Sequence, residues 1–246
     1  MKNEIIYAII QAATEFLPIS SSGHLAIASN IISEPDLFMI VFLHLASLLA
    51  VIFFTRRELR KLLKFDKESI NYLKFIIIAI IPAAIAGLLF RNLIEMALGS
   101  FLFIGFAYMF TGTILLLTRF SFRKSQLNSK NSLFIGLMQV FALFPGVSRS
   151  GMTISASLFS GIDKEKAVKF SFIIFIPLVI GATILEINQV PEAINPANLI
   201  IPFLICFILS ILFLNFLTYI IKKDLFWIFS IYCYILGIIC FTLYYI

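Results

Sequence analysis

Apolar residues fill most of the chain in long stretches, which short polar segments separate. Six of the stretches are long enough to cross a lipid bilayer as helices. They are Leu37–Thr55, Leu73–Phe90, Gly99–Thr118, Ala167–Leu185, Leu199–Ile221 and Leu225–Tyr245. Three contain a proline, which membrane helices tolerate as a kink: Pro82, Pro177 and Pro202. The pattern predicts an all-α integral membrane protein with about six transmembrane helices.

Two serine-rich turns interrupt apolar sequence elsewhere, and the apolar pieces beside them are too short to cross a bilayer alone. The first turn joins Glu4–Phe16 to Gly23–Ile32, and the second joins Ser132–Phe144 to Gly151–Gly161. A helix–turn–helix that enters the membrane and returns on the same side fits such a pair of pieces. We therefore expect two re-entrant helical hairpins in addition to the six spans.

The two turns are similar to each other at a fixed offset of 128 positions. The matched residues are Gln11 with Gln139, Phe16 with Phe144, and Ser20, Ser22 and Gly23 with Ser148, Ser150 and Gly151. Internal repeats mark many transport-type membrane folds, in which the site lies where the repeats meet. Chance similarity of two apolar segments is the alternative. The sequence predicts one membrane domain over residues 1–246, with repeats at about 1–118 and 119–246.

The positions of the basic residues provide a check on the predicted number of transmembrane helices. Most of them lie in four segments, Arg56–Lys74, Arg119–Lys130, Lys164–Lys169 and Lys222–Lys223. If the spans alternate and the hairpins are re-entrant, all four segments face one side of the membrane. Because cytoplasmic loops carry the excess of Lys and Arg, both termini of this multi-pass plasma-membrane protein are predicted outside the cytoplasm. The hairpins then enter from opposite sides, so the repeat is inverted.

The amino-acid composition supports the assignment as a membrane protein and gives no reason to expect a nucleic-acid partner. Hydrophobic residues make up 61% of the chain and charged residues 13%, with a mean hydropathy of +1.05. Soluble domains carry about twice as much charge. The net charge of +6 is explained by membrane orientation, so no nucleic-acid partner is expected. Cys206, Cys233 and Cys240 lie in apolar runs without metal-binding spacing and are expected to be packing residues.

Both turns offer residues that cap helices. Pro18 is expected to end the first short helix, and Pro145 plays the same part in the second turn. The cap-type residues that follow are Ser20, Ser21 and Ser22 in the first turn and Ser148 and Ser150 in the second. Two helix N-termini would then direct backbone N–H groups and dipole charge at the membrane interior, which favours phosphate. The alternative is that these serines are only caps.

The turns differ in their ionisable residues, which are costly at membrane depth and are functional candidates by default. In the alignment Glu15 faces Leu143, Ser21 faces Arg149 and His24 faces Met152. The Arg149 guanidinium can bind phosphate oxygens bidentately. Ser21 offers a hydroxyl whose proton His24 or Glu15 could move.

Other interpretations of these residues stay open. Thr153 would add a phosphate hydrogen bond from the first turn of its helix. A Glu15–Arg149 ion pair could serve only to hold the hairpins together. His44 lies in the middle of a span, where a single histidine is more often a hydrogen-bonded packing residue than a catalyst, and we expect it to support the site from outside.

The sequence of both turns resembles the undecaprenyl-diphosphate phosphatase family of the bacitracin-resistance type. Gln11-Ala-Ala-Thr-Glu15-Phe-Leu-Pro-Ile-Ser-Ser-Ser-Gly-His24 is similar to the first family motif, and Pro145-Gly-Val-Ser-Arg149-Ser-Gly-Met-Thr153 to the second. The motifs occur in the family's order, and the resemblance covers essentially the whole chain. It implies a hydrolase that converts undecaprenyl, or another polyprenyl, diphosphate to the monophosphate carrier lipid and inorganic phosphate. This activity serves cell-wall polymer synthesis and bacitracin tolerance.

The resemblance also implies the site residues and partners. The implied catalytic residues are Glu15, Ser21, His24 and Arg149, and the implied substrate-binding residues are Gln11, Ser20, Ser22, Ser148, Ser150 and Thr153. The family is associated with a divalent cation, Mg²⁺ or Ca²⁺. One carboxylate and one imidazole are too few to hold an ion unaided, so Glu15 together with the lipid diphosphate is the candidate ligand set. The expected partners are the polyprenyl diphosphate substrate and membrane lipids, and a homodimer is left open.

Two other classes of function remain as alternatives. A polyprenyl-phosphate transporter or flippase would use the same features, because inverted repeats with broken helices suit alternating access. A non-catalytic membrane scaffold is the second alternative. For a phosphatase, direct attack by water competes with attack by Ser21. The prenyl chain length and the membrane face to which the site opens are also left open.

Overall fold

The computed structural model describes residues 2–30, 32, 36–121, 124–187 and 199–245, and over these residues it contains helices and turns but no strand. Six helical segments are long and apolar enough to span a membrane, as the sequence predicted. They are α3 (Leu37–Phe54), α5 (Lys67–Leu89), α7 (Phe101–Leu117) with η1 (Thr118–Phe120), α10 (Lys164–Ile187), α11 (Ile200–Lys222), and η3 (Phe226–Ile228) with α12 (Phe229–Tyr245). The chain is therefore an all-helical, multi-pass membrane protein.

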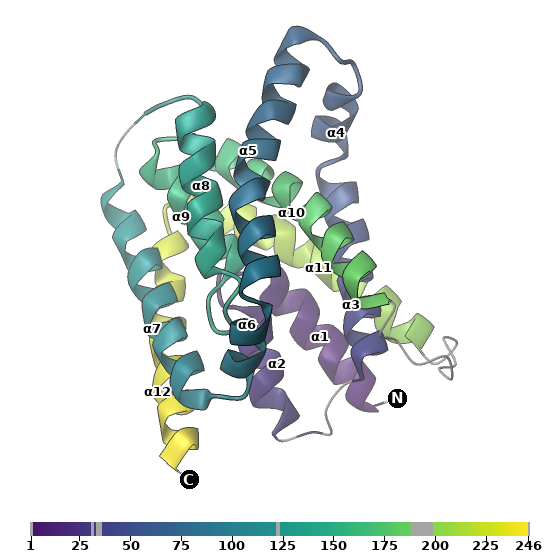
Figure 1. Ribbon diagram of the computed structural model, residues 1–246, viewed down its shortest axis with the longest axis vertical. Helices are drawn as coiled ribbons and strands as arrows, with labels where there is room; N and C mark the ends of the chain where they lie inside the picture. The colour runs from purple at the N-terminus through teal and green to yellow at the C-terminus, as the bar shows by residue number, and fades with distance from the viewer. Residues whose placement is uncertain (1, 31, 33–35, 122–123, 188–198, 246) are drawn as a thin grey trace.

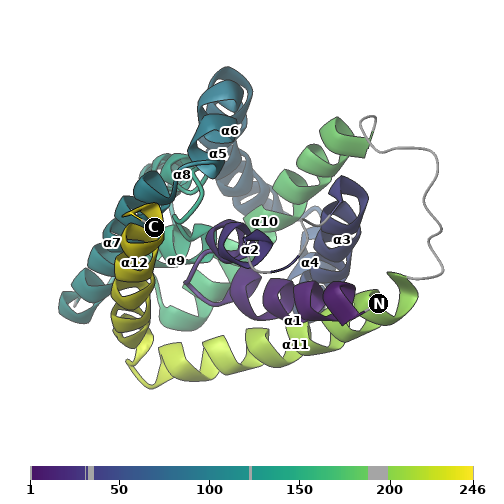
Figure 2. The same cartoon turned by 90° about the horizontal axis from the view of Figure 1, so that it is seen from below.

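Each serine-rich turn joins two short helices, as predicted. The first turn joins α1 (Lys2–Phe16) to α2 (Ser21–Ser29), and the second joins α8 (Ser129–Phe141) to α9 (Arg149–Phe159). In Figure 1 the purple α1–α2 hairpin occupies the lower part of the molecule and the α8–α9 hairpin the upper part. Seen from below, α2 lies near the centre of the bundle (Figure 2). Re-entry of the hairpins from opposite sides of a bilayer stays a prediction.

The contacts between helices occur in matched pairs. Helix α1 packs against α11, and α8 packs against α5, while α3 contacts α10 and α7 contacts α12. If α8, α10, α11 and α12 correspond to α1, α3, α5 and α7, these are the contacts that a pair of twofold-related repeats would make. The division into repeats near residue 118 nevertheless stays a prediction.

Three local features differ from the prediction. Two helices were not expected, α4 (Arg56–Leu62) and α6 (Arg91–Leu98). Both are short and contain charged residues, so a search for apolar stretches of membrane length does not find them. Pro202 lies in the first turn of α11, where a proline fits without a kink, whereas Pro82 and Pro177 lie inside α5 and α10.

The four basic segments gather at one end of the bundle. Lys169 forms an ion pair with Glu58 of α4, and Lys222 at the end of α11 pairs with Glu165 at the start of α10. The segment after α7 joins them through the Ser125 N–H, which donates to the Gly161 carbonyl at 2.7 Å. This basic end is uppermost in Figure 1, and the start of α1 and the end of α12 lie at the lower end. Which end faces the cytoplasm stays a prediction.

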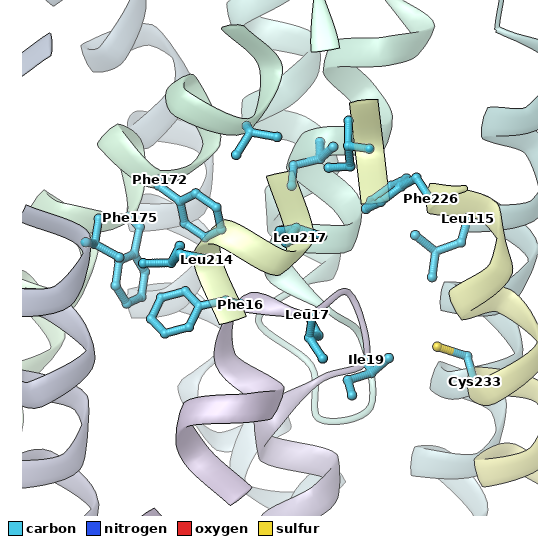
Figure 3. Close-up of a cluster of buried hydrophobic side chains, with 14 of the residues drawn as sticks. Phe16, Leu17, Ile19, Leu115, Phe172, Phe175, Leu214, Leu217, Phe226 and Cys233 are labelled. Carbon is cyan, nitrogen blue, oxygen red and sulfur yellow. The ribbon is translucent and has the colours of Figure 1, made fainter. Parts of the chain in front are cut away.

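An apolar core surrounds the first turn. Phe16 and Leu17 are buried against side chains from α10 and α11, and the Phe16 ring meets Phe172 edge-on with a centroid separation of 5.6 Å (Figure 3). Cys233 of α12 belongs to the same cluster, and all three cysteines are free and buried. This packing fixes the end of α1, and with it the backbone that carries Glu15.

The second turn depends on glycine at position 146, where φ is +88° and a Cβ would lie 2.7 Å from the Ile104 carbonyl oxygen. We expect Gly146→Ala to destabilise the fold by about 1–3 kcal/mol, because backbone strain and a backbone clash act together. The melting temperature in detergent should fall by several degrees. Gly181→Ala is the matched control, since a Cβ there meets nothing within 4 Å. Equal melting temperatures for the two variants would contradict this account of the turn.

Candidate active site where the two hairpin turns meet

Hydrogen bonds hold the two turns against each other. Ser20 is the N-cap of α2, and its hydroxyl oxygen accepts from the Gly23 N–H at 3.4 Å and from the Gly146 N–H of the other turn at 3.2 Å. From the second turn the Ser150 hydroxyl donates to the Leu17 carbonyl at 3.2 Å. The N-termini of α2 and α9 therefore meet, 128 positions apart in the sequence.

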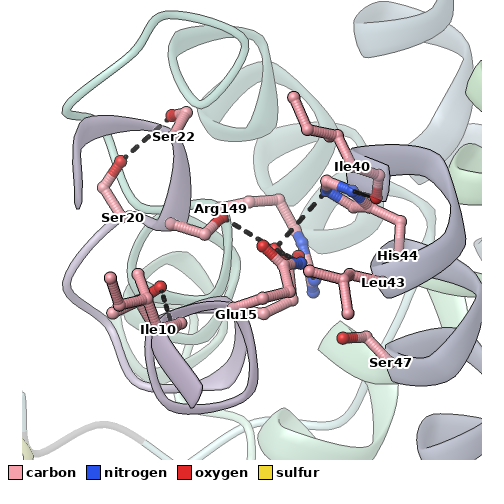
Figure 4. Close-up of polar contacts among 12 residues, drawn as sticks. Ile10, Glu15, Ser20, Ser22, Ile40, Leu43, His44, Ser47 and Arg149 are labelled. Atoms are coloured by element: carbon pink, nitrogen blue, oxygen red, sulfur yellow. Dashed lines mark hydrogen bonds and ion pairs between the residues drawn. The ribbon is translucent and has the colours of Figure 1, made fainter. Parts of the chain in front are cut away.

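The Glu15 carboxylate lies at the centre of this junction and accepts three hydrogen bonds (Figure 4). Its Oε1 accepts from Arg149 Nη2 at 3.0 Å. Its Oε2 accepts from the Ser21 hydroxyl at 2.7 Å and from Gln11 Nε2 at 3.1 Å. Helix α1 supplies Gln11 and Glu15, and the first residues of α2 and α9 supply Ser21 and Arg149. The structure thus brings together four of the predicted site residues.

The Arg149 guanidinium is held from two sides and still has an unused nitrogen. It lies over the Phe175 ring, 3.9 Å from the centroid, and forms the ion pair with Glu15. Its Nη1 is buried and has no hydrogen-bond partner among the described residues. Because a buried N–H without an acceptor costs about 1–3 kcal/mol, this nitrogen favours an oxyanion ligand.

His44, which we expected to support the site from outside, lies beside the carboxylate. Its Nε2 lies 3.8 Å from Glu15 Oε2, and its Nδ1 lies 2.8 Å from the Ile40 carbonyl oxygen. Hydrogen bonding to Ile40 assigns a proton to Nδ1 and directs Nε2 at Glu15. The signal in the sequence was an ionisable side chain in the middle of an apolar span, the same signal that singled out Glu15.

The hydrogen bonds of His24 go to residues other than Glu15. Its Nδ1 is 2.7 Å from the Ser20 carbonyl oxygen and 3.0 Å from the Tyr108 hydroxyl, and its Nε2 is 2.8 Å from the Tyr232 hydroxyl. The ring also stacks on Tyr232. A role for His24 in moving the Ser21 proton stays a prediction, because in this structure that proton is shared with Glu15.

The remaining predicted site residues form hydrogen bonds with other groups of the protein. The Ser148 hydroxyl caps α9 by accepting from the Gly151 N–H at 3.1 Å, and the Thr153 hydroxyl donates to the Arg149 carbonyl at 2.9 Å. The hydroxyls of Ser20 and Ser22 lie 3.3 Å apart, and those of Ser148 and Ser150 lie 3.2 Å apart. The predicted caps Ser20 and Ser148 are thus confirmed. Direct contact of these residues with a substrate stays a prediction.

The junction does not fit a resident divalent cation. Over the described part of the chain, no three His, Cys, Asp or Glu side chains come close enough to hold a metal ion together. Both oxygens of Glu15 already accept hydrogen bonds, and one of the donors is the Arg149 guanidinium. A second cation at this carboxylate would be repelled by the first.

Comparison with known proteins identifies the family. The family model described as "Bacitracin resistance protein BacA" matches residues 4–239. The chain belongs to this family. Its relatives include an undecaprenyl-diphosphatase of Thermosipho melanesiensis, 41% identical over 249 residues that cover 98% of each chain. An undecaprenyl-diphosphatase of Methanococcus maripaludis is 38% identical and spans 97% of this chain and 98% of its own. The family membership indicated by the two motifs is therefore confirmed, and both motifs lie within the matched BacA region.

Proposed function

We propose that this chain is a membrane hydrolase that converts undecaprenyl diphosphate to undecaprenyl phosphate and inorganic phosphate. Relatives with this activity in their names match it over nearly the full length of both chains. The observation that carries the proposal is a serine hydroxyl bound to a buried carboxylate at 2.7 Å, beside a buried guanidinium with an unused N–H. A nucleophile within hydrogen-bond reach of its base is the arrangement that covalent catalysis requires.

In the proposed reaction the Ser21 oxygen attacks the terminal phosphorus of the lipid diphosphate. A bond forms between Ser21 Oγ and phosphorus, and the bond from phosphorus to the bridging oxygen breaks. The bridging oxygen leaves with the electron pair as undecaprenyl monophosphate, and the Ser21 proton passes to Glu15. Glu15 loses this proton to solvent and then accepts a proton from a water molecule, whose oxygen attacks the phosphorus of the phosphoserine. The bond from phosphorus to Ser21 Oγ breaks, inorganic phosphate leaves, and the proton passes from Glu15 to Ser21 Oγ.

Arg149 supplies the positive charge that this reaction needs. Nη2 holds the carboxylate in place, and Nη1 is available for a non-bridging phosphate oxygen. Stacking on Phe175 keeps the guanidinium plane fixed, so the donor is oriented before the substrate arrives. The isoprenoid tail lies among the apolar, lipid-facing helices.

We expect His44→Ala to slow phosphate release by about 10- to 100-fold, because it removes the imidazole that faces Glu15 Oε2. His44→Gln is the matched control, since it keeps a polar side chain of similar length beside Glu15 and should retain more of the rate. Initial rates at saturating substrate, measured for both variants, separate a loss of turnover from a loss of substrate affinity. A wild-type rate for His44→Ala would show that this residue does not contribute to catalysis.

In this proposal a divalent cation is only a counter-ion of the lipid diphosphate, and no step depends on it. Since the described residues do not fit a resident ion, we expect the purified and desalted chain to carry far less than one Mg²⁺ or Ca²⁺ per chain. Elemental analysis of the protein without substrate checks this. A stoichiometric bound ion would contradict it.

The orientation in the plasma membrane is part of the same proposal. The positive-inside rule supports a cytoplasmic basic end and both termini outside the cytoplasm. The test is modification by a membrane-impermeant reagent in intact cells. A single cysteine is introduced at exposed Lys64 or near the end of α12, in a variant in which the three native cysteines are replaced. We expect labelling only of the cysteine near the end of α12. Labelling only of the cysteine at position 64 would show the opposite orientation.

The experiment that tests the function is phosphate release by the purified chain in detergent. Undecaprenyl diphosphate should yield one inorganic phosphate and one undecaprenyl phosphate per molecule, without a membrane or a gradient. A lipid carrier releases no phosphate under these conditions. Absence of release from folded protein, with and without added Mg²⁺ or Ca²⁺, would sink the hydrolase proposal.

A further inference from the structure

A cavity opens at the basic end of the bundle, and its lining residues differ from those at the junction of the turns. Its volume is about 880 Å³, and it is lined by η1, by Ser121, Lys124 and Ser125 after it, and by the α9–α10 and α11–η3 turns. None of the Glu15, Ser21 or Arg149 side chains lines it. The charged and aromatic residues that do are Arg119, Lys124, Asp163, Lys164, Asp224 and Trp227.

The two acidic side chains in this cavity already have partners. Asp224 forms an ion pair with Lys164 at 2.5 Å. Asp163 caps the start of α10, where its Oδ1 accepts from the backbone N–H of Glu165 and of Lys166 at 3.1 and 3.3 Å. The carboxylates therefore neutralise Lys164 and a helix N-terminus, and they leave the other basic groups of the cavity uncompensated.

Arg119 and Lys124 are those uncompensated groups. In the ranges that the structure describes, neither has a carboxylate oxygen within 4 Å. The Arg119 guanidinium lies over the Trp227 ring, 4.8 Å from its centroid. Stacking on a ring uses the face of the guanidinium and leaves its N–H edge free for a bidentate bond to phosphate.

The residues on either side of Lys124 form hydrogen bonds with the end of α9 and the turn after it. The Ser121 hydroxyl donates to the Leu158 carbonyl at 2.5 Å, and the Ser125 N–H donates to the Gly161 carbonyl at 2.7 Å. These bonds hold Ser121 and Ser125 against the end of α9 at the wall of the cavity. Arg119 of η1 and Lys124 of the segment after it thus line the same cavity.

We propose that this cavity binds the phosphate headgroup of an anionic phospholipid from the leaflet that borders the basic end. Basic pockets between transmembrane helices at a membrane surface suit such headgroups, and tryptophan favours the same interfacial level. The elements that line the cavity expose two large apolar side chains, Phe120 and Ile228, and Leu117 at the end of α7 is also exposed. A ligand whose phosphate carries acyl chains matches this combination better than free phosphate does.

Lipid binding by the full-length chain in detergent tests the proposal. Titration with phosphatidylglycerol or phosphatidylcholine, followed by native mass spectrometry, compares the wild type with Arg119→Ala/Lys124→Ala. The matched control is Arg57→Ala/Lys64→Ala, which removes the same two charge types from exposed positions at the same end but outside the cavity. We expect the wild type to prefer phosphatidylglycerol, and the cavity variant to weaken its binding by about tenfold or more, with little change in the control.

Three results would overturn the proposal. One is equal binding of the two lipids by the wild type, and another is equal weakening in both double variants, which would indicate a non-specific basic surface. The third is displacement of the lipid by millimolar inorganic phosphate, which would indicate a site for free phosphate. If the double alanine variant does not fold, Arg119→Gln provides the same comparison with one charge removed.

Discussion

Arg149→Ala is expected to slow phosphate release from undecaprenyl diphosphate by about 10³-fold, which is the effect of removing a preorganised donor to a developing oxyanion. The variant loses the buried Nη1 donor that has no partner among the described residues. It also leaves the Glu15 carboxylate buried without its cation. Initial rates of phosphate release in detergent, with the melting temperature of each preparation, measure both consequences.

Arg149→Lys is the control that separates substrate binding from a purely structural ion pair. Lysine retains a positive charge for Glu15 but cannot present the second, parallel N–H group of the guanidinium. Its melting temperature should therefore stay nearer to that of the wild type than the melting temperature of Arg149→Ala, in which a broken buried pair costs about 3–5 kcal/mol. Its rate should still be low. A wild-type rate for Arg149→Lys would support the structural interpretation instead.

Ser21→Ala is expected to slow release by about 10³-fold or more, because the variant lacks the oxygen that forms the bond to phosphorus. The hydroxyl is bound to Glu15 Oε2 at 2.7 Å and is partly exposed, so it can reach a bound phosphate. Ser29→Ala is the matched control. Its hydroxyl, on the same helix, donates to the Ala26 carbonyl at 2.9 Å rather than to the carboxylate, and its loss should have a much smaller effect.

The size of the Ser21→Ala effect distinguishes the two nucleophiles. If water attacks directly, the variant loses only a hydrogen bond to Glu15, and the rate should fall by about tenfold. Serine as nucleophile predicts a phosphoserine that accumulates or can be trapped by acid quenching when the terminal phosphate of the substrate is labelled. A small rate effect without a trapped intermediate would assign the attack to water.

The spans and the hairpins could be predicted because apolar length and helix caps are local properties of a sequence. The six predicted apolar stretches form six long helices in the structure, and Ser20 and Ser148 are N-cap residues. Helices α4 and α6 could not be predicted in this way, because a short charged helix depends on its tertiary neighbours for stability. Within the site, the repeat predicted that the turns meet, and the ion pair between Glu15 and Arg149 joins them.

The contacts of the two histidines could not be predicted, because they depend on how the helices pack. His24 lies in a motif, yet it contacts Tyr108 of α7 and Tyr232 of α12. His44 lies outside both motifs, yet α3 packs beside α1 and directs its imidazole at Glu15. Neither arrangement follows from spacing along the chain, since each partner comes from a different helix.

The most direct test of the account is an experimental structure of the chain with orthovanadate, a mimic of the transferred phosphate group. We expect the anion at the junction of the two turns, beside the Ser21 hydroxyl and within hydrogen-bond distance of the Arg149 guanidinium. An anion bound elsewhere, with the Glu15–Arg149 pair undisturbed and Ser21 free of contact, would contradict a phosphatase site at this junction.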